Sequence, residues 1–323
     1  MTVLVTGAAG FIGFHVAARL LADGNRVVGV DNMNAYYDVS LKQARLDRLG
    51  HLPGFVFRQL DVSDREAIHA LADEFPDVTR IVHLAAQAGV RHSLSDPYTY
   101  VTANVMGQVV MLELARRFGR LRHVVYASSS SVYGGNEDLP FSVEDRVERP
   151  CSLYAATKRA GELIAASYAH IHGLPSTGLR FFTVYGPWGR PDMAAFLFAR
   201  AILAGEPIRV FNHGEMWRDF TYIDDIVAGV VAALERPPAS TPPHALYNLG
   251  NHRAEKLTDF IAVLERALGR KAELRLEPMQ PGDVARTFAD IEASQRDLGF
   301  APATPISVGL PKFVEWYRGY YAA

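Results

Sequence analysis

A tyrosine and a lysine that could carry out acid–base chemistry stand four positions apart, as Tyr154 and Lys158. Residues 153–172 contain few helix breakers besides Gly161, so we expect a helix there. Positions four apart share one helix face, which brings the phenol and the ammonium into the same space. A nearby ammonium stabilises a phenolate and lowers the tyrosine pKa towards neutrality. Tyr154 is therefore a candidate general acid and base for a sugar or alcohol hydroxyl.

A glycine-rich segment follows the first predicted strand, residues 2–6, and contains Gly7, Gly10 and Gly13. Residues 14–23 are then expected to form a helix that ends at Gly24. This order is typical of a dinucleotide site, although the spacing is GxxGxxG and not GxGxxG. Gly7 would permit the tight turn, Gly10 the approach of the pyrophosphate, and Gly13 the packing of helix on strand. The phosphates would lie at the helix N-terminus, which favours anions.

The second predicted strand, residues 26–30, leads into Asp31 and Asn32. A carboxylate at this place can accept hydrogen bonds from both adenosine ribose hydroxyls. It would also repel a 2′-phosphate, so the sequence favours NAD over NADP. Asn32 is expected beside the adenosine, as are Asp61 and Val62, which follow a third strand at residues 55–60.

Three further strands are predicted at residues 80–86, 123–127 and 176–181, with helical runs between the strands. This alternation predicts an α/β fold with a Rossmann-like doubly wound parallel sheet. In such sheets, ligands bind beyond the carboxyl ends of the strands. Residues 85–91 and the serine run at 128–131 would lie at that edge, and serine hydroxyls can both donate and accept hydrogen bonds there.

The composition changes after residue 186, where the alternation of strands and helices is lost. We therefore predict two domains. Residues 1–185 together with 219–236 would form the NAD-binding Rossmann domain. Residues 186–218 and 237–323 would form a second, smaller α/β substrate domain, which begins its second part with a proline-rich surface loop at 237–243.

The composition excludes several classes of function. The chain has 323 residues, 49% of them hydrophobic, and a net charge of −2, so no basic excess points to nucleic acid or an anionic membrane. No apolar run approaches the roughly 20 residues of a membrane span. The only cysteine, Cys151, permits no intrachain disulfide. The first strand leaves no room for a signal peptide, so we expect a cytoplasmic protein. No spacing of His, Cys and carboxylates predicts a metal.

The glycine segment, the serine run and the Tyr154–Lys158 pair together resemble the extended short-chain dehydrogenase/reductase superfamily. Two other segments resemble the UDP-glucuronate 4-epimerases, a family of NAD-dependent nucleotide-sugar epimerases. They are Val-Asp-Asn-Met-Asn-Ala-Tyr-Tyr-Asp at residues 30–38 and Arg-Phe-Phe-Thr-Val-Tyr-Gly-Pro-Trp-Gly-Arg-Pro-Asp-Met at residues 180–193. The resemblance covers essentially the whole chain. It implies reversible C4 epimerisation of UDP-glucuronate to UDP-galacturonate through a 4-keto intermediate, with tightly bound NAD.

The resemblance also implies roles for individual residues. The catalytic residues would be Ser129, Tyr154 and Lys158. The NAD contacts would be Gly7, Gly10, Phe11, Ile12, Gly13, Asp31, Asn32, Asp61, Val62, Leu84, Ala85, Ala86, Gln87, Asn104, Ala127, Tyr154, Lys158 and Phe181. The UDP-sugar contacts would be Arg91, Ser129, Ser130, Thr183, Arg190, Phe211, Arg218, Asp283 and Arg286. Gln280 stands where related glucose epimerases carry arginine, so Arg286 is the alternative for the diphosphate. Cys151 is not expected to act, because no covalent step is needed.

A uronate substrate poses a chemical problem. Its 4-ketone makes the C6 carboxylate a β-keto acid, which loses carbon dioxide when the C5–C6 bond stands perpendicular to the carbonyl plane. By resemblance, Arg190 would hold the carboxylate in another orientation through two parallel hydrogen bonds. Arg190 could instead be a hinge residue or a diphosphate contact.

Two other enzymatic functions are alternatives to UDP-glucuronate 4-epimerisation: a UDP-glucose 4-epimerase and a decarboxylase that forms a UDP-pentose. A protein that senses or binds NAD without turnover would usually lack the Tyr or the Lys. Dehydratases normally carry acidic residues where this chain has Ser130 and Ser131. Family resemblance also implies a homodimer with a four-helix interface built from residues 105–118 and 153–172.

Overall fold

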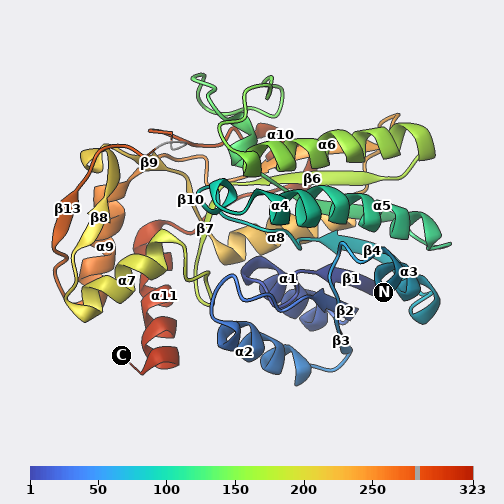
Figure 1. The fold of residues 1–323 in the computed structure, drawn as a ribbon, viewed down its shortest axis with the longest axis horizontal. Helices are drawn as coiled ribbons and strands as arrows, with labels where there is room; N and C mark the ends of the chain where they lie inside the picture. Colours follow the sequence, from blue (N-terminus) through green and yellow to red (C-terminus); the bar gives the residue numbers. More distant parts are fainter. Residues whose placement is uncertain (281–283, 323) are drawn as a thin grey trace.

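Seven parallel strands form the central sheet of the computed structural model, which describes residues 1–280 and 284–322 (Figure 1). The strand order is β11-β6-β5-β4-β1-β2-β3. The strands are β1 (Thr2–Thr6), β2 (Arg26–Asp31), β3 (Phe55–Gln59), β4 (Val78–His83), β5 (His123–Ser129), β6 (Ser176–Phe181) and β11 (His244–Leu249). The chain moves outward from β1 in both directions, which is the doubly wound order. The predicted Rossmann-like sheet is therefore confirmed.

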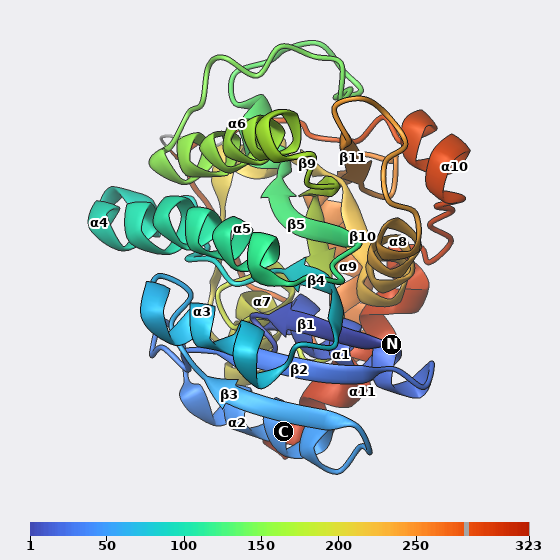
Figure 2. The ribbon, with the colours of Figure 1, turned by 90° about the vertical axis from the view of Figure 1, so that its right-hand side faces the viewer.

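Helices cover both faces of this sheet (Figure 2). The helices are α1 (Phe11–Ala22), α2 (Val39–Gly50), α3 (Arg65–Glu74), α5 (Gly107–Arg117), α6 (Leu153–His172) and α8 (Ile223–Glu235). Val3 and Val5 of β1 pack with α1, α2 and α8, whereas Leu4 packs with α3, α5 and α6 on the other face. A strand buried on both faces needs apolar residues at every position, which explains the unbroken apolar run of β1.

Several element ends differ from those predicted. Helix α1 begins at Phe11, directly after Gly10, and so includes Gly13. Strand β4 ends at His83, and β5 continues through the first two serines to Ser129. The serines are tolerated in the strand because β6 pairs with it as far as Phe181, and the backbone ladder continues.

The predicted domain division is wrong for residues 244–249. They form β11, which pairs in parallel with β6 along its whole length and so completes the central sheet. The next helix along, α10 (Glu292–Leu298), packs against β11 and α8. An edge strand is only half covered, so its sequence lacks the apolar run by which the inner strands were recognised. The rest of the division stays a prediction.

The remaining elements gather beyond the carboxyl ends of the sheet strands (Figure 1). Helices α7 (Ala194–Ala204), α9 (Leu257–Leu268) and α11 (Ile306–Tyr321) pack together there. Three two-stranded pairs accompany them: β7 (Thr183–Tyr185) with β10 (Phe220–Tyr222), β8 (Ile208–Val210) with β13 (Leu274–Leu276), and β9 (Trp217–Arg218) with β12 (Glu255–Lys256). Among the described residues, no helix combines the length and the apolar character needed to cross a bilayer.

Candidate active site

The carboxyl ends of the sheet strands open into a cavity of about 1520 Å³. A site for one small ligand is usually about 300–1,000 Å³, so this cavity has room for two ligands side by side. It is lined by the predicted cofactor and substrate residues with three exceptions. Asn104 and Arg286 do not line it, and Asp283 lies outside the described residues.

The glycine loop leaves a cradle that only glycine can provide. Gly7 has a φ of +71°, and a Cβ atom there would come within 2.9 Å of the backbone nitrogen of Ala85. A Cβ atom on Gly13 would come within 2.0 Å of the carbonyl oxygen of Gly7. Helix α1 starts here with no side chain capping its first turn, so its N–H groups face the cavity as an anion site. The loop thus fits a dinucleotide diphosphate.

Replacing Gly13 by Ala is expected to weaken NAD binding by at least about tenfold, because overpacking forces the backbone to move. The comparison variant is Gly119→Ala, since a Cβ atom at Gly119 would meet nothing within 4 Å. The measurement is the dissociation constant for NAD by titration calorimetry. Equal affinities for the two variants would contradict the proposed role of the loop.

Asp31 ends β2 beside the glycine loop, where its side chain is buried. It accepts hydrogen bonds from the backbone nitrogen atoms of Ala9 at 3.2 Å and Met33 at 2.9 Å. The ammonium of Lys42 lies 3.6 Å from the carboxylate. These contacts hold the carboxylate at the cavity wall with acceptor sites remaining for ribose hydroxyls. Asn32 donates to Asp61 at 2.8 Å, which brings two of the three predicted adenosine contacts together.

Asn104 has a different position from the one implied by resemblance. It lies in a π-helical stretch, η2 (Val101–Met106), and is buried away from the cavity. Its amide oxygen accepts from the Gln87 backbone at 2.8 Å, and its amide nitrogen donates to the Gln87 carbonyl at 3.0 Å and to Thr157 at 3.1 Å. Asn104 therefore ties the loop after β4 to α6, and its partner Gln87 lines the cavity.

Tyr154 and Ser129 both line the cavity and lie within hydrogen-bonding reach of each other. Tyr154 stands in the first turn of α6, whose N-cap Ser152 accepts from the Ala155 backbone at 3.1 Å. The aromatic ring also packs edge-on against Tyr100, with the ring centroids 6.1 Å apart. Ser129, at the end of β5, donates to the Ser131 hydroxyl at 3.1 Å. The prediction that strand end and helix bring these side chains together agrees with the structure.

Lys158 lies beside the Tyr154 ring on α6 and also contacts strand β5. Its ammonium lies 6.0 Å from the Tyr154 ring centroid and donates to the Ala127 carbonyl at 3.0 Å. Burial raises the pKa of Tyr154, and a hydrogen bond with Ser129 and the charge of Arg190 oppose this rise. Burial also lowers the pKa of Lys158 to about 8, which Glu162 opposes. Ser129 and Arg190 thus favour the phenolate, and the lowering of the Tyr154 pKa by Lys158 stays a prediction.

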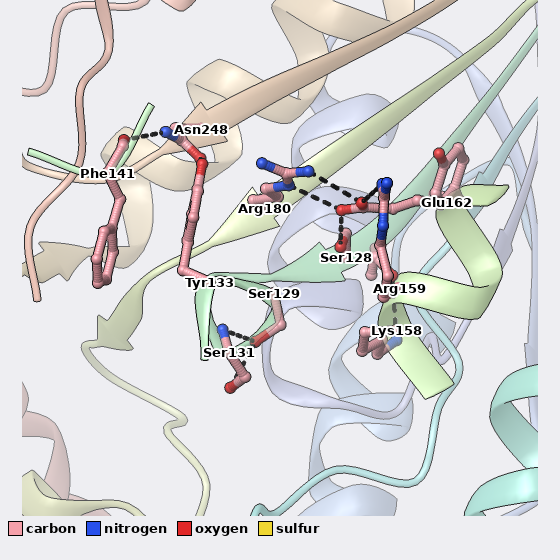
Figure 3. Close-up of polar contacts among 12 residues, drawn as sticks. Ser128, Ser129, Ser131, Tyr133, Phe141, Lys158, Arg159, Glu162, Arg180 and Asn248 are labelled. Atoms are coloured by element: carbon pink, nitrogen blue, oxygen red, sulfur yellow. Dashed lines mark hydrogen bonds and ion pairs between the residues drawn. The ribbon is translucent and has the colours of Figure 1, made fainter. Parts of the chain in front are cut away.

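A buried ion network lies directly behind Lys158 and Ser129 (Figure 3). Glu162, one helical turn after Lys158, accepts from Arg180 at 2.8 and 3.0 Å and from Arg159 at 2.9 Å. It also accepts from the Ser128 hydroxyl at 2.6 Å. Burial would raise the pKa of Glu162, but the hydrogen bonds, that of Arg180 first, hold it below its usual value. The network fixes α6 against β5 and β6, which carry Ala127, Ser129 and Phe181.

Arg190 enters the cavity from the loop after β7, where it pairs with Asp192. The guanidinium donates through Nε to one carboxylate oxygen at 3.0 Å and through Nη2 to the other. Tyr36 donates to the same carboxylate at 3.1 Å. Both Tyr36 and Asp192 line the cavity, yet the sequence reasoning did not select them. Their place inside the two epimerase-like segments was the available signal.

Cationic and aromatic side chains gather at the far end of the cavity. The guanidinium groups of Arg91 and Arg209 lie 4.5 and 5.0 Å from the ring centroid of Phe211. Arg218 also lines the cavity, which suits the phosphates of a nucleotide. Arg286 instead lies over the Trp217 ring at 5.1 Å, outside the cavity. Arg209 was missed because a single arginine in a short strand carries no sequence signal.

No group of three or more His, Cys, Asp or Glu side chains suited to hold a metal ion occurs in the described part of the chain. The expectation of a metal-free site stays a prediction. Cys151 is exposed at the cavity edge, and its sulfur contacts the carbonyl of Arg149 at 3.8 Å.

Comparisons with known proteins agree with this geometry. The sequence profile of the NAD dependent epimerase/dehydratase family matches residues 3–250. The chain is 49% identical to UDP-glucuronate 4-epimerase 3 of Arabidopsis thaliana, over 99% of this chain and 77% of that protein. It is 46% identical to the probable UDP-glucuronate 4-epimerase of Rhizobium meliloti, over 99% and 98% of the two chains.

A crystal structure with the same fold is that of UDP-glucuronic acid 4-epimerase from Bacillus cereus, in complex with UDP-glucuronic acid and NAD. It superposes with a TM-score of 0.92 at 35% identity, over 99% of this chain and 100% of that chain. The profile covers most of the sequence, and the two relatives cover nearly all of it. The chain therefore belongs to the NAD dependent epimerase/dehydratase family.

Proposed function

We propose that this protein interconverts UDP-glucuronate and UDP-galacturonate by inversion at C4, with NAD as its cofactor. The observation that carries the proposal is the meeting of Ser129, Tyr154 and Arg190 in the cavity that also contains the glycine loop. Those groups supply, respectively, a hydroxyl partner, a proton acceptor and a carboxylate-binding fork. The relatives named above, with their UDP-glucuronate activity, support the same substrate.

Each of the three catalytic residues has its own role in this mechanism. Tyr154, as phenolate, takes the proton of the 4-hydroxyl, and Ser129 holds the same oxygen. Lys158, fixed by the Ala127 carbonyl, is placed to hydrogen-bond the nicotinamide ribose. NAD, when bound, would accept the hydride from C4 and return it to the opposite face of that carbon. Between these two transfers, the 4-ketone turns over in the pocket while the nucleotide stays anchored. Tyr154 then gives the proton back to the C4 oxygen, which completes the inversion.

The test is to incubate the protein separately with UDP-glucuronate and UDP-glucose and to resolve the products by NMR. Formation of UDP-galacturonate from the first, with little conversion of the second, is expected. Predominant conversion of UDP-glucose would favour the hexose epimerase, and UDP-pentose as the main product would favour the decarboxylase.

Replacing Arg190 by Lys is expected to raise the ratio of UDP-pentose to UDP-galacturonate about tenfold. Lysine keeps the positive charge but cannot donate two parallel hydrogen bonds, and a charge-assisted hydrogen bond is typically strong enough to account for such a factor. The ratio is measured by NMR at equal conversion. A ratio equal to that of the unmodified protein would assign Arg190 to another role, such as diphosphate contact.

We further propose a homodimer in which α5 and α6 pack against their symmetry mates. The outer side of α6 exposes Leu163 and Ile171, whose exposed fractions are 56% and 66%, and Met106 is also exposed just before α5. Exposed apolar side chains on adjacent helices are typical of an interface.

Changing Leu163 to Asp is expected to convert the dimer to monomer at micromolar concentrations, since it would bury a charge without a partner. Leu276→Asp, at an equally exposed position on β13, serves as the control and should leave the mass unchanged. Light scattering coupled to gel filtration measures the mass. A monomeric unmodified protein would refute the dimer.

A further inference from the structure

Tyr36, Asp192 and Arg190 form a hydrogen-bonded chain that lines the cavity. The side chains of Arg190 and Asp192 are only 24% and 29% exposed, so solvent screens their interaction weakly. Burial and the Asp192 charge raise the pKa of Tyr36 to about 12, which keeps its phenol a hydrogen-bond donor at neutral pH. Asp192 therefore holds one side of the Arg190 guanidinium, and Tyr36 in turn holds the Asp192 carboxylate.

This chain joins the two epimerase-like segments, residues 30–38 and 180–193, which are far apart in the sequence. Gly89 leaves space for the Tyr36 hydroxyl that contacts Asp192. It has a φ of +102°, and a Cβ atom there would lie 2.4 Å from the Tyr36 hydroxyl oxygen. Buried Arg45 of α2 links the same two segments a second time: it donates to the Tyr37 hydroxyl at 2.8 Å and to the carbonyls of Trp188 and Gly189 at 2.6 and 3.2 Å. The loop that carries Arg190 is therefore anchored on the cofactor side of the molecule.

The geometry of the pair leaves part of Arg190 for a ligand. Asp192 engages Nε and one hydrogen of Nη2, which is the side edge of the guanidinium. A guanidinium has five N–H donors, so both hydrogens of Nη1 and the second hydrogen of Nη2 remain. These donors form an end-on fork, and the Asp192 contact fixes the plane in which the fork lies.

We propose that Asp192, held by Tyr36, is a positioning residue that fixes the plane of Arg190 and thereby decides whether the 4-keto intermediate is epimerised or decarboxylated. This inference rests on the function proposed above. A carboxylate gripped by a fixed fork cannot turn its C5–C6 bond perpendicular to the ketone. An Arg190 that rotates freely would still attract the carboxylate but would not hold its orientation.

The competing step is a simple β-keto acid decarboxylation. The C5–C6 bond breaks, and its electron pair becomes the C4–C5 enolate with the negative charge on the C4 oxygen. Carbon dioxide leaves, and C5 takes a proton to restore the ketone. Return of the hydride to C4, with a proton to its oxygen, then gives a UDP-pentose. The ratio of UDP-pentose to UDP-galacturonate therefore reports the orientation of the carboxylate.

The experiment compares Asp192→Asn, Tyr36→Phe and a matched control, Asp297→Asn, in the full-length protein. Asp297 accepts from Arg296 at 2.8 and 3.0 Å and from Tyr247 at 3.2 Å. It therefore has the same arginine and tyrosine partners as Asp192, but on the outside of the molecule. NMR measures the ratio of UDP-pentose to UDP-galacturonate, and initial rates give the KM for UDP-glucuronate. The affinity for NAD and the thermal unfolding of each variant are also measured.

In Asp192→Asn, the ratio of UDP-pentose to UDP-galacturonate should rise about tenfold, since a charge-assisted pair is lost.

KM should fall or stay constant in the same variant, because Arg190 keeps its charge and loses the competing carboxylate. Tyr36→Phe should raise the ratio by a smaller factor, about fivefold, since it removes one neutral donor. Asp297→Asn should leave the ratio unchanged. A purely structural role would lower total activity and NAD affinity without moving the ratio.

An unchanged ratio in Asp192→Asn, or an equal rise in Asp297→Asn, would overturn the inference. Should Asp192→Asn fail to fold, Tyr36→Phe decides, and an unchanged ratio there would overturn it as well. An unmodified protein that forms no UDP-galacturonate would instead refute the proposed function itself, which separates the two failures.

Discussion

Tyr154→Phe is expected to reduce turnover of UDP-glucuronate by about 10²–10⁴-fold, the usual contribution of a positioned acid–base group. The change removes only the hydroxyl group, which is the group proposed to take the proton from the sugar. The ring itself should stay in place, because its edge-on contact with Tyr100 and its position in the first turn of α6 do not involve that oxygen. Binding of the nucleotide sugar should therefore change little.

The measurement for this variant is kcat together with the dissociation constant of UDP-glucuronate. The matched control is Tyr168→Phe on the same helix, whose hydroxyl donates to Glu113 at 2.7 Å away from the cavity. We expect it to keep full turnover. Turnover of Tyr154→Phe comparable to that of the control would show that the phenol is not the proton acceptor.

Glu162→Gln is expected to destabilise the fold by about 3–5 kcal/mol, the usual cost of removing one partner from a buried ion pair. Arg180 and Glu162 are each 1% exposed, so the guanidinium would be left without its counter-charge in the core. The Arg180 guanidinium also lies 4.8 Å from the Tyr133 ring centroid, so an aromatic ring and not water borders it there. Glutamine keeps the size of the side chain, which limits the change to the charge.

The free energy of unfolding in urea measures this effect. Glu74→Gln is the control, because its pair with Arg58 is exposed at 42% and 41% and should contribute only about 0–1 kcal/mol. Equal losses in the two variants would mean that the buried network contributes no more than a surface pair.

The parts of the fold that the sequence predicted are those whose signals are local. Helix α6 has the predicted bounds, because Ser152 caps its start and Gly173 ends it in a left-handed conformation. The glycine loop is equally local, since Gly13 meets Gly7 within a single turn of chain. The Tyr154 and Lys158 pair needed only the period of a helix.

The parts that were missed depend on contacts between distant segments. β11 is recognisable only from its pairing with β6, and Asn104 only from its bonds to Gln87 and Thr157. The contact between Lys158 and the Ala127 carbonyl was missed for the same reason, because Ala127 belongs to the separate strand β5. The spacing of two residues along a helix predicts that they share a face, but not which groups on other segments they contact.

Trp188 shows the same limit, since nothing in the sequence explained why it is aromatic. Its ring packs with Phe14, Trp316 and Tyr320 at centroid distances of 5.6, 5.3 and 5.2 Å, and Arg48 lies over it at 4.8 Å. It therefore clamps the C-terminal helix α11 against α1 and α2. Its φ of +61° is unusual for a bulky residue, so this packing must stabilise a strained loop next to Arg190.

In the proposed mechanism, hydride leaves C4 and returns to the same carbon, while Tyr154 handles only the proton on oxygen. The direct measurement is to run the reaction of UDP-glucuronate in D₂O and to follow C4 and C5 of the product by NMR. UDP-galacturonate with protium at C4 is expected, because the transferred hydride never exchanges with solvent. Deuterium at C4 of the epimer would show that inversion proceeds by proton abstraction from that carbon and would refute the hydride mechanism, whereas deuterium at C5 would report only enolisation of the 4-ketone.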